Sequence, residues 1–166
     1  EGVDEFDFKR WEKLVKYFKG GRLIDLGCLD SLVPVMAKNK FPDSQVYAID
    51  LAKQAISEMQ HSYPNIMWEV GDVYETHFPS NYFHYAVAGE LMEHLESPEK
   101  FLKETFRILK PGGILALSTP FDEKIGDVDA ERHLWSFNIQ DIRDLLQPYG
   151  KVKISLFPLF HVPYTR

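Results

Sequence analysis

The feature that most limits the fold of this 166-residue chain is the alternation of short apolar runs with segments of helical periodicity. The runs are strand-sized, and between them apolar residues recur three or four positions apart, as they do on one face of a helix. Such alternation is typical of βαβ units, which build a parallel sheet covered by helices. We therefore expect an α/β fold, a Rossmann-like three-layer sandwich with a mostly parallel sheet and helices on both faces.

Six to seven strands are predicted. They span 22–26, 46–49, 66–70, 83–88, 114–118 and 152–157, with a short edge strand at 159–164 that Pro163 weakens. The predicted helices are one through Phe8 to Phe18, one opening near Ser31, one after Asp50, one capped by Ser97 and ended at 110–113, and one over 138–149.

The length and the net charge of the chain limit the number of domains and the classes of ligand that it can have. A chain of this length fits one domain, and we assign residues 1–166 to it. The formal charge of −6 argues against a basic surface that holds nucleic acid, so a small-molecule acceptor or ligand is favoured. No apolar run approaches the roughly 20 residues of a membrane span, and we expect no membrane contact. The charge does not predict an oligomeric state.

Cys28 is the single cysteine, which excludes an intrachain disulfide and makes the cytoplasm the expected location. A small buried side chain is the expected role of Cys28, because nothing nearby could act as its base.

The turn after the first predicted strand indicates a nucleotide-like ligand. It runs from Asp25 through Gly27 to Ser31, and Asp50 ends the second strand. A glycine there lets the backbone approach a ligand, the following helix N-terminus attracts a carboxylate, and an acid on the next strand can accept both ribose hydroxyls. A dinucleotide is disfavoured, because Leu29 and Leu32 stand where its fingerprint needs glycine.

Four segments together resemble the class I S-adenosylmethionine-dependent methyltransferases, especially the group that includes the ubiquinone-biosynthesis O-methyltransferases. The segments are RLIDLGC (22–28), VYAID (46–50), GDV (71–73) and GELMEHLESPEKFLKETFRILKPGGILALSTP (89–120). The resemblance implies that S-adenosylmethionine is the cofactor. The chain departs from the family pattern at Leu29 and Ser31, where family members usually have further glycines.

The resemblance also implies cofactor-binding roles. Gly27 would lie under the methionine part, Asp50 would hold the ribose, Asp72 would meet the adenine amino group and Val73 would offer its amide. Gly89 and Glu90 would flank the methionine amino end, and Asp25, Cys28 and Leu51 complete the cofactor-binding set. Two simpler interpretations stay open. Asp50 could cap the following helix, and Asp72 could stabilise only the Gly-Asp-Val turn in which it lies.

The cluster of Glu90, Glu93 and His94 has two interpretations. By the resemblance, with His133, it could hold a metal that orients an acceptor hydroxyl. Alternatively, Glu93 and His94 are fixed by the next helix while His133 anchors a loop. We favour the second and predict no metal. His94 is then the first candidate for the catalytic base and His133 the second, because imidazole titrates near neutral pH. The remaining histidines, His61, His77, His84 and His161, follow no ligand spacing.

The predicted function is methyl transfer, at oxygen, to a small molecule. Acceptor contacts are expected from Pro120 to Phe137, where Phe121, Trp135 and Phe137 could form an apolar wall. Two alternatives remain: a metal-assisted RNA 2′-O-methyltransferase, and a module that binds the cofactor without catalysis.

Overall fold

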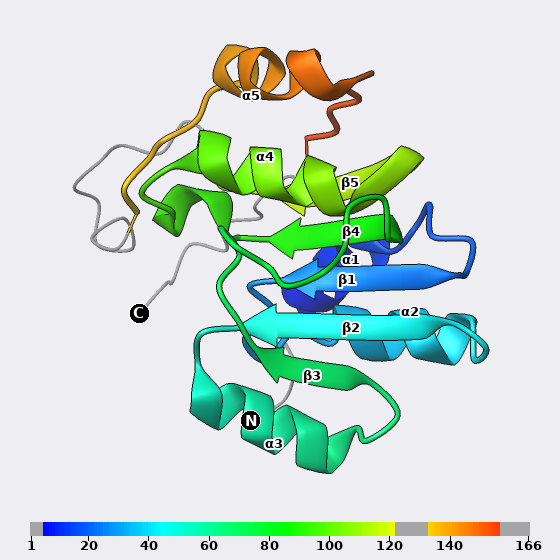
Figure 1. The fold of residues 1–166 in the computed structure, drawn as a ribbon. Helices are drawn as coiled ribbons and strands as arrows, with labels where there is room; N and C mark the ends of the chain where they lie inside the picture. The colour runs from blue at the N-terminus through cyan, green and yellow to red at the C-terminus, as the bar shows by residue number, and fades with distance from the viewer. Residues whose placement is uncertain (1–4, 122–132, 157–166) are drawn as a thin grey trace, which may run out of the picture.

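A computed structural model of the protein describes residues 5–121 and 133–156. The described residues contain five strands, in the order β3-β2-β1-β4-β5, and every pair is parallel (Figure 1). In chain order the elements are α1 (Glu5–Leu14), β1 (Arg22–Leu26), α2 (Val33–Lys40), β2 (Gln45–Asp50), α3 (Lys53–Ser62), β3 (Met67–Val70), β4 (Phe83–Gly89), the 3-10 turn η1 (Met92–His94), α4 (Pro98–Ile108), β5 (Leu109–Ser118), α5 (Ile139–Leu146) and the 3-10 turn η3 (Gln147–Tyr149).

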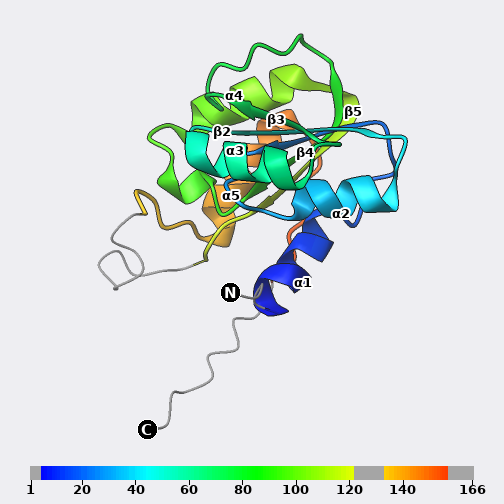
Figure 2. The ribbon, with the colours of Figure 1, turned by 90° about the horizontal axis from the view of Figure 1, so that it is seen from below.

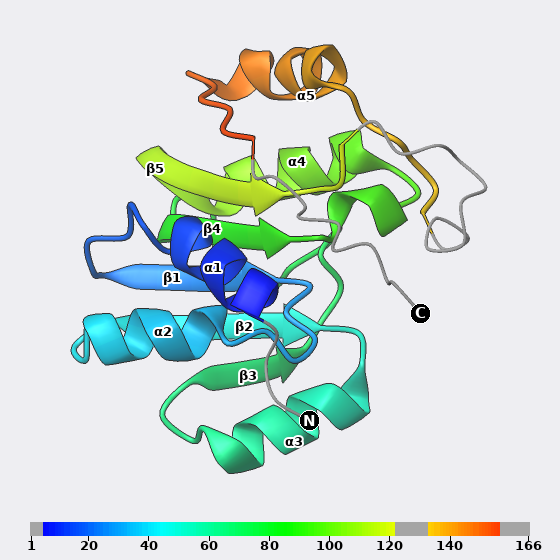
Figure 3. The same cartoon turned by 180° about the vertical axis from the view of Figure 1, so that it is seen from behind.

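Alternating side chains of the strands build two cores, one on each face of the sheet. On the first face, Leu23 of β1 packs with buried residues of α1, α2 and α3. On the second, Ile24 and Leu26 pack with buried residues of α4, and α5 adds partly buried ones. Figure 3 shows α1 and α2 in front of the sheet, and Figure 2 shows α4 on the opposite side from them. This is the expected three-layer arrangement.

β1 is the centre of the topology. The chain first adds β2 and β3 on one side of β1, then returns to place β4 and β5 on the other side. The carboxyl ends of the strands share one edge, and ligands of open α/β sheets bind at the point where the strand order reverses. That point lies between β1 and β4, so the turn beginning at Gly27 and the segment beginning at Gly89 are neighbours there.

The start of α4 follows the predicted capping. Ser97 accepts a hydrogen bond from the Lys100 amide, and Pro98 opens α4. Asn138 and Asp141 form a reciprocal capping box at α5. Among the described residues, none of the helices has the length and apolarity that crossing a bilayer would require.

The structure corrects one predicted strand and one predicted boundary between a helix and a strand. Residues 152–156 were expected to begin a sixth strand but form none, and Phe157 lies outside the described residues. Lys153 instead reaches the Tyr17 hydroxyl at 3.2 Å, and a strand exists only where its backbone finds a partner. The predicted seventh strand, 159–164, lies outside the described residues altogether.

The second correction concerns the end of α4. Residues 110–113 were expected to separate helix from strand, but β5 already begins at Leu109, which pairs with Phe83. The register shifts between Phe83 and Tyr85, and regular pairing resumes at Ile114. Gly112, at a φ of 77°, accommodates the irregularity.

Candidate functional site

The loop after β1 turns sharply at Gly27. The φ of Gly27 is 68°, and the amides of Gly27 and Cys28 both donate to the Ile49 carbonyl, at 2.9 and 3.1 Å. A Cβ at Gly27 would lie 2.5 Å from Cδ1 of Leu91. The positive φ therefore favours glycine here, and a larger residue would also have to displace the Leu91 side chain. The predicted turn at Gly27 is confirmed.

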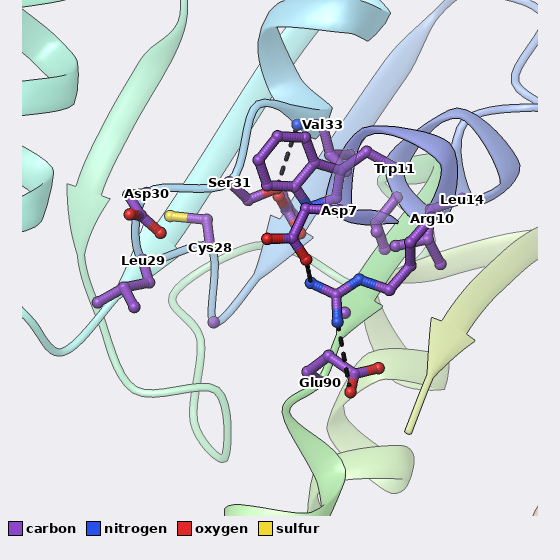
Figure 4. Close-up of a pocket in the computed structure, with 14 residues that line it drawn as sticks. Asp7, Arg10, Trp11, Leu14, Cys28, Leu29, Asp30, Ser31, Val33 and Glu90 are labelled. Carbon is purple, nitrogen blue, oxygen red and sulfur yellow. Dashed lines mark hydrogen bonds and ion pairs between the residues drawn. The ribbon is translucent and has the colours of Figure 1, made fainter. Parts of the chain in front are cut away.

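A pocket opens beside this loop, between α1 and the end of β4 (Figure 4). About 600 Å³ of space, part of it open to solvent, lies within it. Its lining comes from α1 (Asp7, Arg10, Trp11, Leu14), from β1 and the segment after it (Asp25, Gly27, Cys28, Leu29, Asp30, Ser31, Val33) and from β4 and the residue after it (Val87, Gly89, Glu90). Five of the nine predicted cofactor-binding residues line it: Asp25, Gly27, Cys28, Gly89 and Glu90.

The charges of the pocket are uneven. Four acidic side chains line it, whereas Arg10 is the one basic side chain in the described lining. Nη2 of Arg10 lies 2.7 Å from Oδ1 of Asp7, and its Nη1 lies 3.3 Å from Oε2 of Glu90. The pocket therefore suits a ligand with more positive than negative groups.

Asp25 is a buried carboxyl in the pocket wall, with 2% of its surface exposed. Burial, with a smaller contribution from the charge of Asp50, raises the pKa of Asp25 to about 7. Its Oδ2 has no hydrogen-bond partner among the described residues. Burial likewise raises the pKa of the neighbouring Cys28 thiol, which fits the predicted inert role of that residue.

Asp50 joins the first two loops. Its Oδ2 accepts the Leu29 amide at 2.9 Å, and its Oδ1 accepts the Ala52 amide at 2.8 Å, just before α3. The second bond forms a turn before α3 and is not the predicted helix cap, because Ala52 is the N-cap of α3 and no side chain accepts from the amides of its first turn. Each carboxylate oxygen can accept more than one hydrogen bond, so these contacts leave capacity for ribose hydroxyls.

Four predicted cofactor residues lie outside the pocket lining: Asp50, Leu51, Asp72 and Val73. Leu51, directly after Asp50, is 70% exposed. Asp72 accepts the Tyr74 amide at 2.8 Å, which is the local turn of its plainer interpretation, and the Val73 side chain is buried in the core. The loop that carries Asp72 and Val73 is tied to α4, because Glu104 accepts the Thr76 amide at 2.8 Å.

A second group of polar side chains brings Glu93, His94 and His133 together. One ligand atom from each lies within 4.8 Å of the others, and the two imidazole rings lie 4.7 Å apart between centroids. Carboxylate and imidazole groups at this spacing could hold a divalent ion. Glu90, the fourth residue of the predicted cluster, is not in this group, because its carboxylate faces Arg10 in the pocket.

Glu93 is the buried member of this group, 1% exposed. Burial raises the pKa of Glu93 to about 7. Its Oε2 accepts the Thr119 hydroxyl at 2.9 Å, whereas Oε1 has no hydrogen-bond partner among the described residues and lies 4.0 Å from Nε2 of His94. The Glu93 carbonyl accepts the amides of Leu134 and Trp135, which brings His133 close to His94.

The predicted apolar wall is corrected at one of its three residues. Phe137 is buried in the core beneath α5, so it offers no surface to an acceptor. Phe121 and Trp135 stay partly exposed, and Trp135 is held by a hydrogen bond from its Nε1 to the Leu95 carbonyl at 2.7 Å. Of the expected acceptor segment, 120–137, the structure describes 120–121 and 133–137.

Sequence reasoning missed the contribution of α1 to the site. Asp7, Arg10, Trp11 and Leu14 all line the pocket, whereas none of these residues was among the predicted site residues. A signal was present, because Asp7, Arg10 and Leu14 recur at helical spacing and place two charged residues beside the apolar face.

Residues 24–117 match the sequence model of the methyltransferase domain. A probable S-adenosylmethionine-dependent methyltransferase of Mycobacterium tuberculosis is 27% identical over 126 residues, covering 74% of this chain and 46% of its own length. The malonyl-[acyl-carrier protein] O-methyltransferase of Hahella chejuensis is 26% identical over 152 residues, covering 84% of this chain and 54% of its own length. The chain thus spans about half the length of these two relatives.

Solved structures support the fold. An S-adenosylmethionine-dependent methyltransferase from Aquifex aeolicus superimposes with a TM-score of 0.71, covering 89% of this chain and 83% of that one, at 19% identity. At that identity, the similarity speaks for the fold alone.

Proposed function

This chain belongs to the methyltransferase domain family of S-adenosylmethionine-dependent enzymes, and from that membership we propose that it transfers a methyl group from S-adenosylmethionine to oxygen of a small-molecule acceptor. The cofactor would occupy the pocket between α1, the β1–α2 loop and the end of β4. The observation that carries the proposal is the charge of that pocket.

The residues present fit the cofactor. S-adenosylmethionine has two cationic groups, the sulfonium and the α-ammonium, and one carboxylate. Four acids and one arginine line the pocket, and because Asp25 is partly protonated near neutral pH, the other three acids supply the excess of negative charge. The balance of charges in the pocket still matches the balance of the ligand. The buried Oδ2 of Asp25, which has no partner among the described residues, also indicates that a polar ligand completes this wall.

The adenosine part would extend from the pocket along the strand ends. In this proposal Asp50 accepts the ribose hydroxyls while it keeps the Leu29 amide, Leu51 contacts the base, and Asp72 and the Val73 amide meet the adenine edge. Gly27 lets the backbone approach closely, and Gly89 and Glu90 flank the amino-acid end.

The cofactor, when bound, supplies a methyl group already activated by its positive sulfur. The protein then has mainly to align the acceptor and exclude water. His94 and His133 are the residues proposed to take a proton from an acceptor hydroxyl, with the orphaned Oε1 of Glu93 beside His94. Phe121 and Trp135 would contact the apolar part of the acceptor.

A binding experiment tests the cofactor first. S-adenosylhomocysteine, the demethylated product, should raise the melting temperature at millimolar concentration, whereas NADH should not. A rise with NADH alone would overturn the assignment. Transfer of a labelled methyl group to a panel of small phenols, alcohols and carboxylic acids then tests the reaction. Binding without any transfer would instead support a non-catalytic module.

A metal-assisted RNA 2′-O-methyltransferase is the second candidate. The convergence of Glu93, His94 and His133 favours it, whereas the net charge of −6 disfavours a nucleic-acid partner. Retardation of RNA in a gel that weakens with salt, together with methyl transfer that requires magnesium or manganese, would favour this candidate over the first.

A further inference from the structure

We propose that His84 and Lys110, at the edge of the sheet opposite the cofactor pocket, form a binding site for a phosphate ion or a phosphate monoester. His84 is the second residue of β4 and Lys110 the second residue of β5. The strands are parallel, so the amino ends of β1, β4 and β5 lie together (Figure 1). Neither residue lines the pocket, and the proposed methyl transfer uses neither of them.

This amino edge is basic, although the whole chain has a net charge of −6. The segments at the edge are 15–22, 40–45, 63–66, 79–84, 109–113 and 147–153. Asp43 is the one acid in their sequence, whereas their cations are Lys16, Lys19, Arg22, Lys40, Lys110, Lys151 and Lys153. Within the described part of the chain, no carboxylate forms an ion pair with any of these cations. The edge therefore attracts anions.

The ring of His84 has a fixed arrangement of donor and acceptor. Burial lowers the pKa of His84, and the charges of Lys110 and Arg22 lower it further. The ring is therefore neutral at pH 7 and carries one proton. Its Nδ1 accepts the backbone amide of Arg22 at 3.0 Å, which leaves the proton on Nε2.

Nε2 of His84 faces a second donor. It lies 3.0 Å from Nζ of Lys110, and a lysine ammonium has three hydrogens to donate and no lone pair. Two donors at this distance repel each other unless one acceptor lies beside both. A phosphate oxygen would accept from both groups, and Lys110 and the nearby Arg22 would balance its charge. A phosphate monoester carries about −1.5 to −2 charges and three acceptor oxygens at pH 7, so it suits this edge better than chloride or a carboxylate does.

Glycines on both sides leave this pair of side chains accessible. A Cβ at Gly21 would lie 2.8 Å from Nδ1 of His84, so a larger residue there would displace the ring. A Cβ at Gly112, two residues after Lys110, would meet no atom within 4 Å. His84 is exposed and Lys110 is half-buried, so an anion can reach Nε2 and Nζ from solvent.

Titration with inorganic phosphate tests the site. We expect phosphate, but not chloride at equal ionic strength, to shift the Nε2 nitrogen resonance of His84 saturably. Lys110→Met should weaken phosphate binding about 10-fold or more, because a hydrogen bond from a charged group is lost. Lys110→Arg should keep most of the affinity. Lys53→Met is the charge-matched control, at the exposed first residue of α3, and should bind phosphate as the parent does.

Phenyl phosphate separates the two sources of the ligand. Tighter binding of phenyl phosphate than of inorganic phosphate would identify a phosphorylated small molecule, and equal or weaker binding would identify the free ion. Either result supports the site. An equal shift with chloride in the parent protein, or parental phosphate affinity in Lys110→Met, would overturn it. S-adenosylhomocysteine should bind to Lys110→Met as to the parent, so failure of this site is distinguishable from failure of the proposed function.

Discussion

The amide of Leu29 donates to Oδ2 of Asp50 at 2.9 Å while the Leu29 backbone is held at a φ of 41°. A leucine in this left-handed region costs roughly 1–2 kcal/mol relative to a right-handed conformation. The resemblance expects glycine here, and the loop keeps the conformation that glycine would favour. Leucine at this position therefore keeps the hydrogen bond to Asp50 but lowers the stability of the folded protein.

We predict that Leu29→Gly is neutral or stabilising, by up to about 1 kcal/mol. Relief of the left-handed strain should offset the greater flexibility of glycine in the unfolded chain. Leu51→Gly is the matched control, an exposed leucine in the next loop without a positive φ, and it should destabilise. Urea denaturation measures both. A loss of more than 1 kcal/mol in Leu29→Gly would mean that the leucine side chain itself stabilises the loop.

Asp50→Ala should weaken S-adenosylhomocysteine binding more than Asp72→Ala does. Asp50 accepts two amides from two loops and is proposed to hold two ribose hydroxyls, whereas Asp72 accepts one amide within its own turn. A hydrogen bond to a charged group contributes about 1.5–3 kcal/mol, so we expect a loss of at least tenfold for Asp50→Ala. Calorimetry on both folded variants decides the order. Parent-like binding by Asp50→Ala would leave Asp50 only the structural role of joining its two loops.

The buried Asp25 should make stability fall as pH rises from about 4 to about 7. Its pKa is about 7 in the folded protein, above the ordinary value of 3.8, so over this range the folded state keeps a proton that the unfolded state releases. The stabilisation is complete below the unfolded pKa and is lost as pH passes the folded one. Asp25→Asn should make the profile of unfolding free energy less steep in this range, and the slope that remains should come from Glu93, whose pKa is also raised to about 7. Asp30→Asn, an exposed acid in the same loop, should keep the parental slope.

Cofactor binding should survive removal of divalent ions. Glu93, His94 and His133 do not line the pocket, so a chelator should leave the affinity for S-adenosylhomocysteine within about twofold of its starting value. Metal analysis of the purified protein should find no stoichiometric transition metal. Once an acceptor is known, turnover that stops in chelator and returns with magnesium or manganese would contradict our preference and make these three residues ligands.

His94→Ala provides the companion test of the catalytic assignment. If His94 takes the acceptor proton, turnover should fall by about 100-fold or more while binding of S-adenosylhomocysteine stays unchanged. His61→Ala, on α3 and outside the site, should match the parent in both assays. Equal turnover in the two variants would reduce His94 to a structural role.

Several features of the fold and site could be predicted from local pattern alone. Apolar periodicity located all five strands that the structure describes, and Ser97 followed by Pro98 located the start of α4. The turn at Gly27 was predicted correctly because a glycine directly after an apolar strand is a local signal, and the structure adds that its φ is positive. Asp50 was placed at the end of β2 for a similar reason, since a buried apolar run ends there.

Other features depended on pairing and packing between distant parts of the chain. A short run such as 152–156 can be a strand only if an edge accepts it, and periodicity does not reveal that. Phe137 looked like a surface aromatic of a loop, but α5 packs over it. The start of β5 at Leu109 was hidden because helix and strand follow each other without a loop, and only pairing with Phe83 marks the boundary.

The sequence by itself therefore determined the order of the elements, the parallel sheet and the glycine turn, because each follows from neighbours within a few residues. Only the tertiary structure decided which side chains share a site. It set Arg10 against Glu90, 80 positions later, and His94 beside His133, 39 positions later. Residues of the short segment 90–94 therefore belong to two places, because Glu90 lines the pocket whereas Glu93 and His94 lie in a separate cluster. Such contacts arise when helices and loops pack across the sheet edge, and that packing depends on the whole core rather than on any one segment.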